Sequence, residues 1–133
     1  MRAFPGTNGK IAFLSDRDGN SEIYTISFTG GKWGNTKRLT DETVYPGLPK
    51  SDKTPSYSPN GKKIVWEQGE YLYLMNPDGS NQHKIPNTRH VNYEIGRYGS
   101  YGGNPAFSRN LPGGNKIIFD KNKDTFTINP DGT

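Results

Sequence analysis

The chain has 133 residues, the size of one domain, and only 24 of them are Leu, Ile, Val or Phe, so the aromatic 12% must supply much of the burial. The 17 glycines and 10 prolines leave little room for long helices and predict an all-β protein. No cysteine, no long apolar run and no apolar leader is present, and the net charge of +4 is dispersed. These features exclude disulfides and thiolate sites, and they argue against membrane insertion, a signal peptide in this chain and nucleic-acid binding.

Three segments of the chain repeat one pattern. They read GKIAF at 9–13, KKIVW at 62–66 and NKIIF at 115–119, and the steps from Ile11 to Ile64 and from Ile64 to Ile117 are both 53 residues. The segment 76–80, which contains Asn-Pro-Asp-Gly, also recurs 53 residues later at 129–133. A repeat of this length indicates one supersecondary unit per copy.

Each copy is expected to form successive β-strands. In the first copy we place strands at 10–15, 22–28 and 36–40, with a longer hairpin loop at 16–21. In the second copy short strands at 57–58, 63–67, 71–75 and 82–85 alternate with turns rich in Pro, Asn and Gly, which predicts a four-stranded meander. The third copy repeats the pattern from 105 and ends just after its last turn.

The segments 11–24, 38–40 and 55–62 carry recognisable motifs: IAFLSDRDGNSEIY, then RLT, then PSYSPNGK. Together they resemble the repeat of the TolB-like β-propellers, which cycles through "PxWSPDGxxIAF", "SxRxGxxxIY", a "DG" turn and "RLT". The resemblance implies three antiparallel four-stranded blades, half of a six-bladed propeller, at about 3–40, 55–86 and 105–133. The last blade is expected to lack its outer strand, and only residues 2–4 would remain of an inner strand for the first blade.

Three blades are too few to close a ring, because propellers have about four to eight. We therefore expect either a homodimer that completes a six-bladed ring or a fragment of a longer propeller. In either case blades bury residues against their neighbours and not in one central core, and we expect Ile64, Trp66, Leu72 and Leu74 to do so.

One loop carries oxygen ligands at alternate positions: Asp16, Asp18 and Asn20. This spacing resembles the start of a calcium loop, although the glycine comes one place early for an EF-hand and no glutamate follows at the right distance. A plain hairpin turn explains the same residues, because Asp, Asn and Gly all favour turns. Calcium therefore remains the only cofactor considered, as the alternative to a turn.

Other polar residues do not assemble into a recognisable active site. His83 and His90 are the only histidines and have no neighbouring carboxylate pattern of a metal site or triad. Ser58 and Ser108 recur in equivalent positions, which indicates a structural hydroxyl and not a nucleophile. Arg17 belongs to the hairpin motif, where we expect it to bond backbone or a carboxylate.

Two connections between the copies are rich in tyrosine. The stretch 92–104 contains Tyr93, Arg97, Tyr98 and Tyr101, and the stretch 41–54 contains Tyr45. Tyr and Arg are enriched at binding surfaces, and loops on a rigid scaffold are where binding residues usually lie. The alternative is that these are long connections whose tyrosines pack on the blade below.

The sequence therefore predicts a non-catalytic propeller module whose inter-blade loops bind a protein or ligand, with self-association as its other contact. By resemblance it would be periplasmic or extracellular. Two alternatives stay open. One is a propeller accessory to a hydrolase or lyase, although this chain contains neither a hydrolase domain nor a histidine-rich metal centre. The other is a purely structural subunit that assembles with itself.

Overall fold

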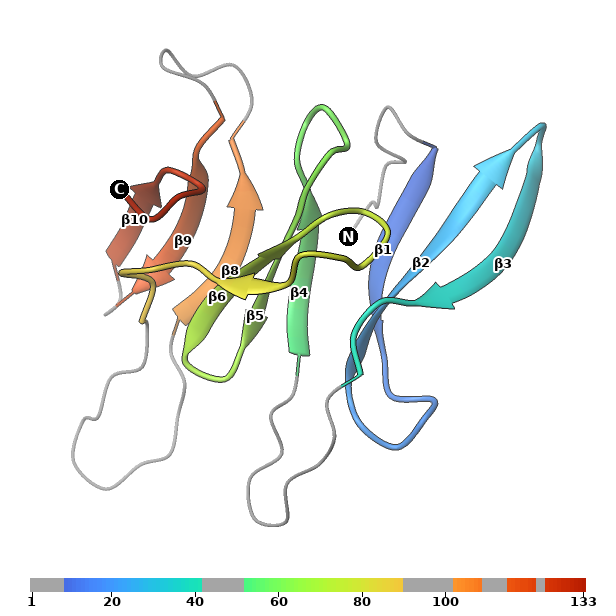
Figure 1. Cartoon of the computed structure of the whole chain (residues 1–133), viewed down its shortest axis with the longest axis horizontal. Helices are drawn as coiled ribbons and strands as arrows, with labels where there is room; N and C mark the ends of the chain where they lie inside the picture. The colour runs from blue at the N-terminus through green and yellow to red at the C-terminus, as the bar shows by residue number, and fades with distance from the viewer. Residues whose placement is uncertain (1–8, 42–51, 90–101, 109–114, 122–123) are drawn as a thin grey trace.

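The structure is a computed structural model that describes residues 9–41, 52–89, 102–108, 115–121 and 124–133. Across these ranges the chain forms ten β-strands and no helix, so the described residues include no helix able to cross a membrane. The strands make three antiparallel sheets, each built from strands that follow one another in the chain (Figure 1). The all-β prediction is confirmed.

The first sheet contains three described strands in the order β1-β2-β3. They are β1 (Lys10–Ser15), β2 (Glu22–Thr29) and β3 (Lys32–Arg38). Thr29 pairs with Lys32 across Gly30 and Gly31, which both have positive φ, at 60° and 77°. A two-residue turn with positive φ at both positions fits the twist of the two strands that it joins. The strand β3 therefore begins directly after the turn, at Lys32, and not at 36 as predicted.

The second sheet is a complete four-stranded meander in the order β4-β5-β6-β7, as predicted. Its strands are β4 (Asp52–Tyr57), β5 (Ile64–Gln68), β6 (Tyr71–Met75) and β7 (His83–Lys84). The first strand begins earlier than predicted because pairing continues past a bulge between Lys53 and Ser56. A β-bulge adds a residue to one strand without ending the ladder, so the Thr-Pro pair there does not stop the strand.

The third sheet contains β8 (Gly102–Phe107), β9 (Ile117–Lys121) and β10 (Asp124–Ile128). Its order is β10-β9-β8, which leaves three strands among the described residues. The bulge of β4 recurs in β8, between Gly103 and Ala106. The first strands of the second and third sheets, β4 and β8, thus have the same bulge next to a proline. The 53-residue repeat is therefore also a repeat of local backbone geometry.

The sheets pack face to face through two apolar clusters. The first and second sheets share one cluster, made of Ile23, Leu39, Ile64, Trp66 and Met75. The second and third sheets share the other, made of Val65, Leu72, Leu74, Ile85, Ile117, Phe119 and Ile128. The prediction that blades bury residues against their neighbours is therefore confirmed for all four residues named for it.

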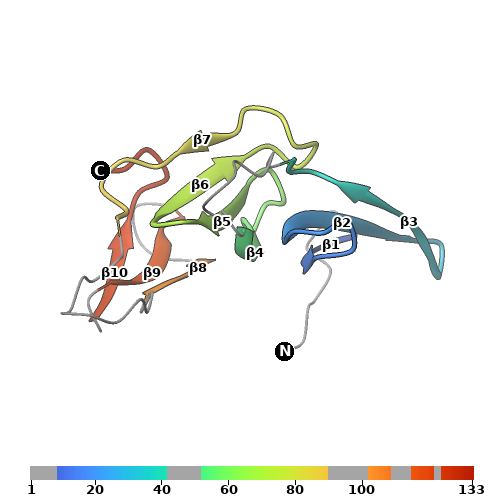
Figure 2. The same cartoon turned by 90° about the horizontal axis from the view of Figure 1, so that it is seen from below.

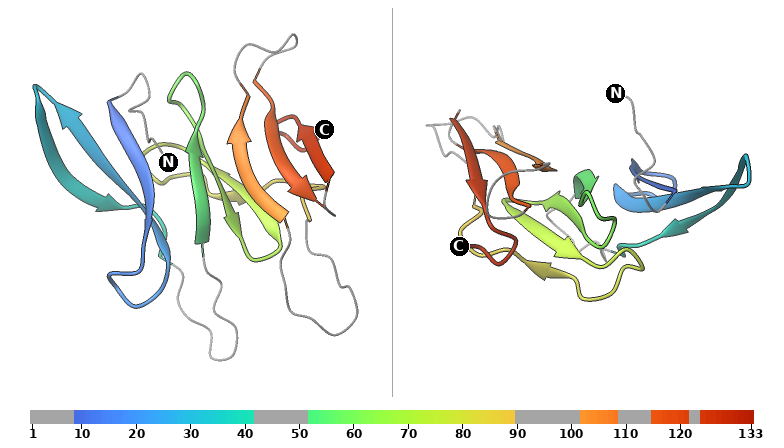
Figure 3. Two further views of the ribbon diagram at one scale, coloured as in Figure 1. Left: turned by 180° about the vertical axis from the view of Figure 1, so that it is seen from behind. Right: turned by 90° about the horizontal axis from the view of Figure 1, so that it is seen from above.

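The three sheets follow one another in chain order (Figures 2 and 3). The first strand of the second sheet, β4, contacts both β1 and β8, so the first strands of the sheets lie close together. The last strands, β3, β7 and β10, lie toward the outside of the row in Figure 2. This is the arrangement of strands within neighbouring blades of a propeller.

Candidate functional site

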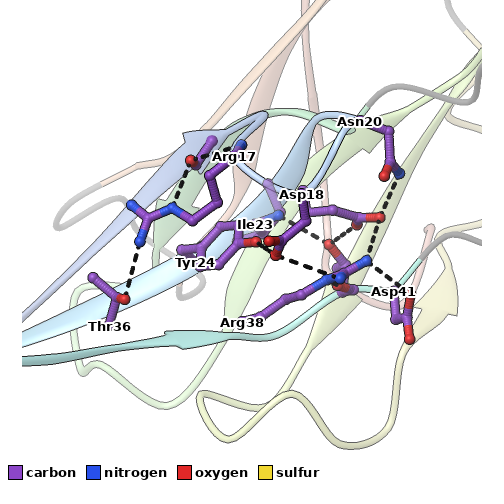
Figure 4. A network of polar contacts seen from close by, with 11 residues as sticks. Arg17, Asp18, Asn20, Ile23, Tyr24, Thr36, Arg38 and Asp41 are labelled. Atoms are coloured by element: carbon purple, nitrogen blue, oxygen red, sulfur yellow. Dashed lines mark hydrogen bonds and ion pairs between the residues drawn. The ribbon is translucent and has the colours of Figure 1, made fainter.

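The hairpin loop between β1 and β2 holds the three residues considered for calcium. A turn closes this loop, with the Gly19 amide donating to the Asp16 carbonyl at 2.9 Å. Asp18 accepts a hydrogen bond from the Tyr24 hydroxyl and lies 3.5 Å from Nη1 of Arg38 (Figure 4). Asn20 turns to β2, where its amide donates to Oε1 of Glu22 at 2.6 Å.

Asp18 and Asn20 therefore have internal partners on β2 and β3. Over the described ranges no group of three or more His, Cys, Asp or Glu side chains is placed to hold a metal ion. The loop geometry matches the hairpin-turn interpretation, to which calcium binding was only the alternative.

Arg38, at the end of β3, is the centre of the polar cluster. Its Nη2 lies 3.1 Å from Oε1 of Glu22 and 2.7 Å from Oδ1 of Asp41, and its Nε donates to the Thr40 carbonyl at 2.7 Å. Glu22 is fully buried, and the Thr40 hydroxyl donates to its other carboxylate oxygen. A buried carboxylate is tolerated when it is paired and hydrogen-bonded, which is the case here.

The electrostatics of this cluster are those of a structural site. The hydrogen bond to Asp18 and burial together raise the pKa of the Tyr24 hydroxyl above its usual range. Burial lowers the pKa of Arg38, but Asp41 and Glu22 raise it more, so the guanidinium stays charged. Tyr24 therefore stays neutral and Arg38 cationic at physiological pH, and neither suits general acid–base catalysis, which needs a pKa near the working pH.

Arg17 lies over an aromatic pair on the outer side of the first sheet. Its guanidinium carbon is 4.7 Å from the centre of the Tyr24 ring and 5.7 Å from that of Phe13. Its Nε donates to Ser15 Oγ at 2.9 Å and its Nη1 to Thr36 Oγ1 at 3.1 Å. The expectation of a backbone or carboxylate partner is wrong, because the loop carries Arg17 over two stacked rings that attract a cation.

The two repeated serines are structural, as predicted. Ser58 Oγ accepts from the Lys63 amide at 2.9 Å, and Ser108 Oγ accepts from the Lys116 amide at 3.0 Å. Each hydroxyl thus closes the turn between the first two strands of its sheet. His83 is exposed, with Nδ1 2.9 Å from the Asn81 carbonyl oxygen.

The tyrosine-rich connections lie outside the described residues. This applies to Tyr45, Tyr93, Arg97, Tyr98 and Tyr101, and also to His90. The binding patch predicted on these loops therefore stays a prediction.

One repeated surface was not identified from the sequence. Each sheet carries on one face an isoleucine and an aromatic residue from one strand, paired with an aromatic and an aliphatic residue from the next. The paired rings lie 5.9, 5.5 and 6.2 Å apart in the first, second and third sheets. The sets are Ile11, Phe13, Tyr24 and Ile26; Ile64, Trp66, Tyr73 and Met75; and Ile117, Phe119, Phe126 and Ile128.

Where a sheet precedes it among the described residues, this surface packs against that sheet, except at Phe126, which is exposed. Ile64 and Trp66 lie in the cluster shared with the first sheet, and Ile117 and Phe119 in the cluster shared with the second. In the first sheet Ala12 and Ile23 pack toward the second sheet. Because side chains alternate along a strand, Phe13 and Tyr24 point the other way.

No protein-family model matches the chain, and no curated protein matches it. Among solved structures, one described as TolB from Agrobacterium tumefaciens matches with a TM-score of 0.52 and 15% identity over 90% of this chain. The chain has a TolB-like β-propeller fold. TolB from Acinetobacter baumannii matches over 92% of the chain at the same identity, with a TM-score of 0.46, and the fold assignment rests on the first structure.

The likeness covers only part of the solved proteins. The chain spans 44% of the length of the Agrobacterium TolB structure and 41% of the Acinetobacter one. At 15% identity the comparison establishes the TolB-like fold, and function has to be argued from the residues of this chain.

Proposed function

We propose that the chain is a non-catalytic β-propeller scaffold that binds a protein or another ligand through the loops between its blades. The observation that carries this proposal is the TolB-like fold, matched over 90% of the chain. Rigid sheets that present variable loops are a common basis for binding. The described polar residues support this role, because the Arg38 cluster and the repeated serines hold strands and turns together.

In this proposal a second copy of the chain completes the propeller. Each described sheet-to-sheet junction buries an apolar cluster, and the outer face of the first sheet carries Ile11, Phe13, Tyr24 and Ile26, so a further sheet can pack there. Two copies would supply six blades, the number that the resemblance implies. We further propose, by the same resemblance, that the protein works in the periplasm or outside the cell.

The proposed binding surface is a tyrosine patch on the connections that follow the first and second sheets. It comprises Tyr93, Arg97, Tyr98 and Tyr101, with Tyr45 on the earlier connection. Tyrosine gives a large contact area with few rotatable bonds, and arginine adds several hydrogen-bond donors. Such residues often dominate the free energy of binding at interfaces.

The patch is tested by the double variant Tyr98→Ala/Tyr101→Ala. Wild type and variant are used as baits in an extract of the source cells, and circular dichroism follows their folding. We expect the variant to stay folded and to lose a protein that co-purifies with the wild type. Unchanged capture by the variant contradicts the proposal, and unfolding of the variant shows that the tyrosines belong to the core.

A further inference from the structure

The outer face of the first sheet has the residues of a packing surface. We call Ile11, Phe13, Tyr24 and Ile26 the aromatic face. Of its counterparts in the other two sheets, Ile64, Trp66 and Ile117 are 0% exposed, whereas Phe126 is 43% exposed. In the aromatic face Arg17 lies over Tyr24, which is buried, but Ile11 and Phe13 are only half-buried. The first sheet therefore presents, without a described neighbour, a face that the other sheets use to receive one.

The outer face of the third sheet is the natural counterpart. We call Ile118, Asp120, Thr125 and Thr127 the acidic face; they point away from the second sheet, because their neighbours Ile117, Phe119 and Ile128 pack toward it. The repeat places Ile118 and Asp120 where the second sheet has Val65 and Glu67. It places Thr125 and Thr127 where the second sheet has Leu72 and Leu74, so this face is the more polar of the two. These are positions of the second sheet that face the third.

Glu67 shows what an acid at this position does. It is buried, at 3% exposed, and its Oε2 lies 3.4 Å from the backbone nitrogen of Asn104 on β8 of the next sheet. In the second sheet an acidic side chain at this position therefore lies at the junction with the following sheet. Because Asp120 has the equivalent position, we take the acidic face as the surface on which a following sheet would pack.

The two outer faces also carry opposite charges. Arg17 covers the rings of the aromatic face, and Asp120 lies on the acidic face, where its carboxylate accepts from the Thr125 hydroxyl at 3.2 Å. Complementary charge on two otherwise apolar or neutral surfaces favours one pairing and one orientation over others. Both surfaces belong to the same chain, so a second copy can supply a neighbour for each.

We propose that the aromatic face of one copy receives the acidic face of a second copy, with Arg17 of the first against Asp120 of the second. The inference rests on the proposed self-association and specifies the surfaces that make it. Since the two faces differ, the contact runs head to tail. Two copies related by a twofold axis make it twice and close a ring.

The test uses charge reversal, with the dissociation constant measured by sedimentation equilibrium. Arg17→Asp or Asp120→Arg puts like charges at both contacts, so each variant alone is expected to associate at least about 100-fold more weakly than wild type. An equimolar mixture of the two variants restores opposite charges at both contacts of a mixed pair. The double variant Arg17→Asp/Asp120→Arg restores them at both contacts of its own pair. We therefore expect the double variant to form dimers again, and the mixture to associate more tightly than either single variant.

Two controls separate charge from folding. Lys62→Asp and Asp124→Arg make the same changes of charge outside both faces and are expected to leave association unchanged, and melting curves check every variant. If either charge reversal unfolds the chain, a cross-linking experiment takes the place of the reversals. The chain has no cysteine of its own, so a disulfide can form only between introduced cysteines. Arg17→Cys and Asp120→Cys are then expected to form a disulfide-linked pair only when mixed.

The outcomes distinguish this inference from the proposed self-association. A wild-type chain that is monomeric at every concentration overturns both. A wild-type dimer that tolerates both reversals, that is not restored in the double variant, or that gives no cross-link between positions 17 and 120 overturns the pairing of these faces and leaves self-association intact.

Discussion

Glu67 and Gly103 meet at the junction of the second and third sheets, with the carboxylate of Glu67 lying where a Cβ of residue 103 would be. Gly103 also has a φ of +88°, a conformation that residues with a side chain rarely adopt. The close approach of the two sheets at this point therefore depends on glycine.

Gly103→Ala is expected to lower the free energy of unfolding by about 2 kcal/mol or more, since backbone strain and overlap with Glu67 act together. Urea unfolding measures the loss. Gly31→Ala is the matched control, because Gly31 has a φ of +77° and a Cβ added there would meet nothing within 4 Å. The control is expected to lose only about 1–2 kcal/mol, and equal losses in both variants would show that the contact with Glu67 contributes nothing.

Two threonine hydroxyls hold equivalent backbone amides in the first and second sheets. Thr40 Oγ1 accepts from the Ile23 amide at 2.9 Å, and Thr88 Oγ1 accepts from the Leu72 amide at 3.1 Å. Both threonines are buried, so Thr→Val leaves a buried amide without its acceptor at nearly constant volume. The resulting loss is expected to be about 1–3 kcal/mol at each position.

Thr40→Val is expected to cost more than Thr88→Val in the same urea experiment. The Thr40 hydroxyl also donates to the carboxylate of Glu22, whereas that of Thr88 donates to the Ile85 carbonyl. A hydrogen bond to a charged group is the stronger of the two. The exposed Thr29 provides the control, because Thr29→Val is expected to change stability by no more than about 0.5 kcal/mol. The reverse order of the two losses would contradict this account.

Arg38 and Glu22 form an ion pair in the first sheet, and a different pair of residues occupies the equivalent positions in the second sheet. The equivalent positions hold Lys84 and Tyr71, with the lysine Nζ 4.4 Å from the ring centre. Arg38→Met leaves the carboxylate of Glu22 buried without its cation, and a loss of about 2–4 kcal/mol is expected. Transplanting the second-sheet pair, as Glu22→Tyr/Arg38→Lys, is expected to restore part of that loss. A double variant less stable than Arg38→Met contradicts the equivalence.

The repeated Asn-Pro-Asp-Gly turns predict a dependence of stability on pH. Hydrogen bonds from the Ser80 hydroxyl and amide lower the pKa of Asp78, and those from Thr133 lower the pKa of Asp131 in the same way. A carboxyl whose pKa is lower in the folded state stabilises the fold above its unfolded pKa. That contribution disappears as pH falls through the folded value.

Asp78→Asn is therefore expected to reduce stability at neutral pH, with the difference from wild type closing below about pH 4. Thermal unfolding as a function of pH measures the difference. Asp131→Asn is expected to behave alike, because its turn has the same bonds. A difference that stays constant down to the lowest pH would show that the carboxylate charge is not the cause.

The repeat and its turns were sufficient to predict most strands of the fold. A 53-residue period, alternating residues and Pro, Asn and Gly turns are local features, so they identify the strands around Ile64 and Tyr71 directly. The beginnings of β3 and β4 were harder to predict. They depend on the Gly30-Gly31 hairpin and on a bulge near Thr54, where pairing with the neighbouring strand decides the boundary.

The polar cluster could be predicted only in part. The motifs contain most of its residues but do not show which of them meet. Asp18 contacts Tyr24 on β2 and Arg38 contacts Glu22 on β2. Arg17 contacts Thr36 on β3, which lies outside the motifs. Alternation shows that a strand has two faces, and only packing of the sheets shows that Phe13 and Tyr24 point away from the second sheet. The outer faces of the first and third sheets therefore became visible only in three dimensions.

The central claim is that this chain is part of a propeller that a second copy completes. Sedimentation equilibrium of the purified wild-type chain over a range of concentrations tests it most directly. The account predicts a folded species with twice the mass of one chain. A folded, cooperatively melting species with the mass of one chain at every concentration would contradict it.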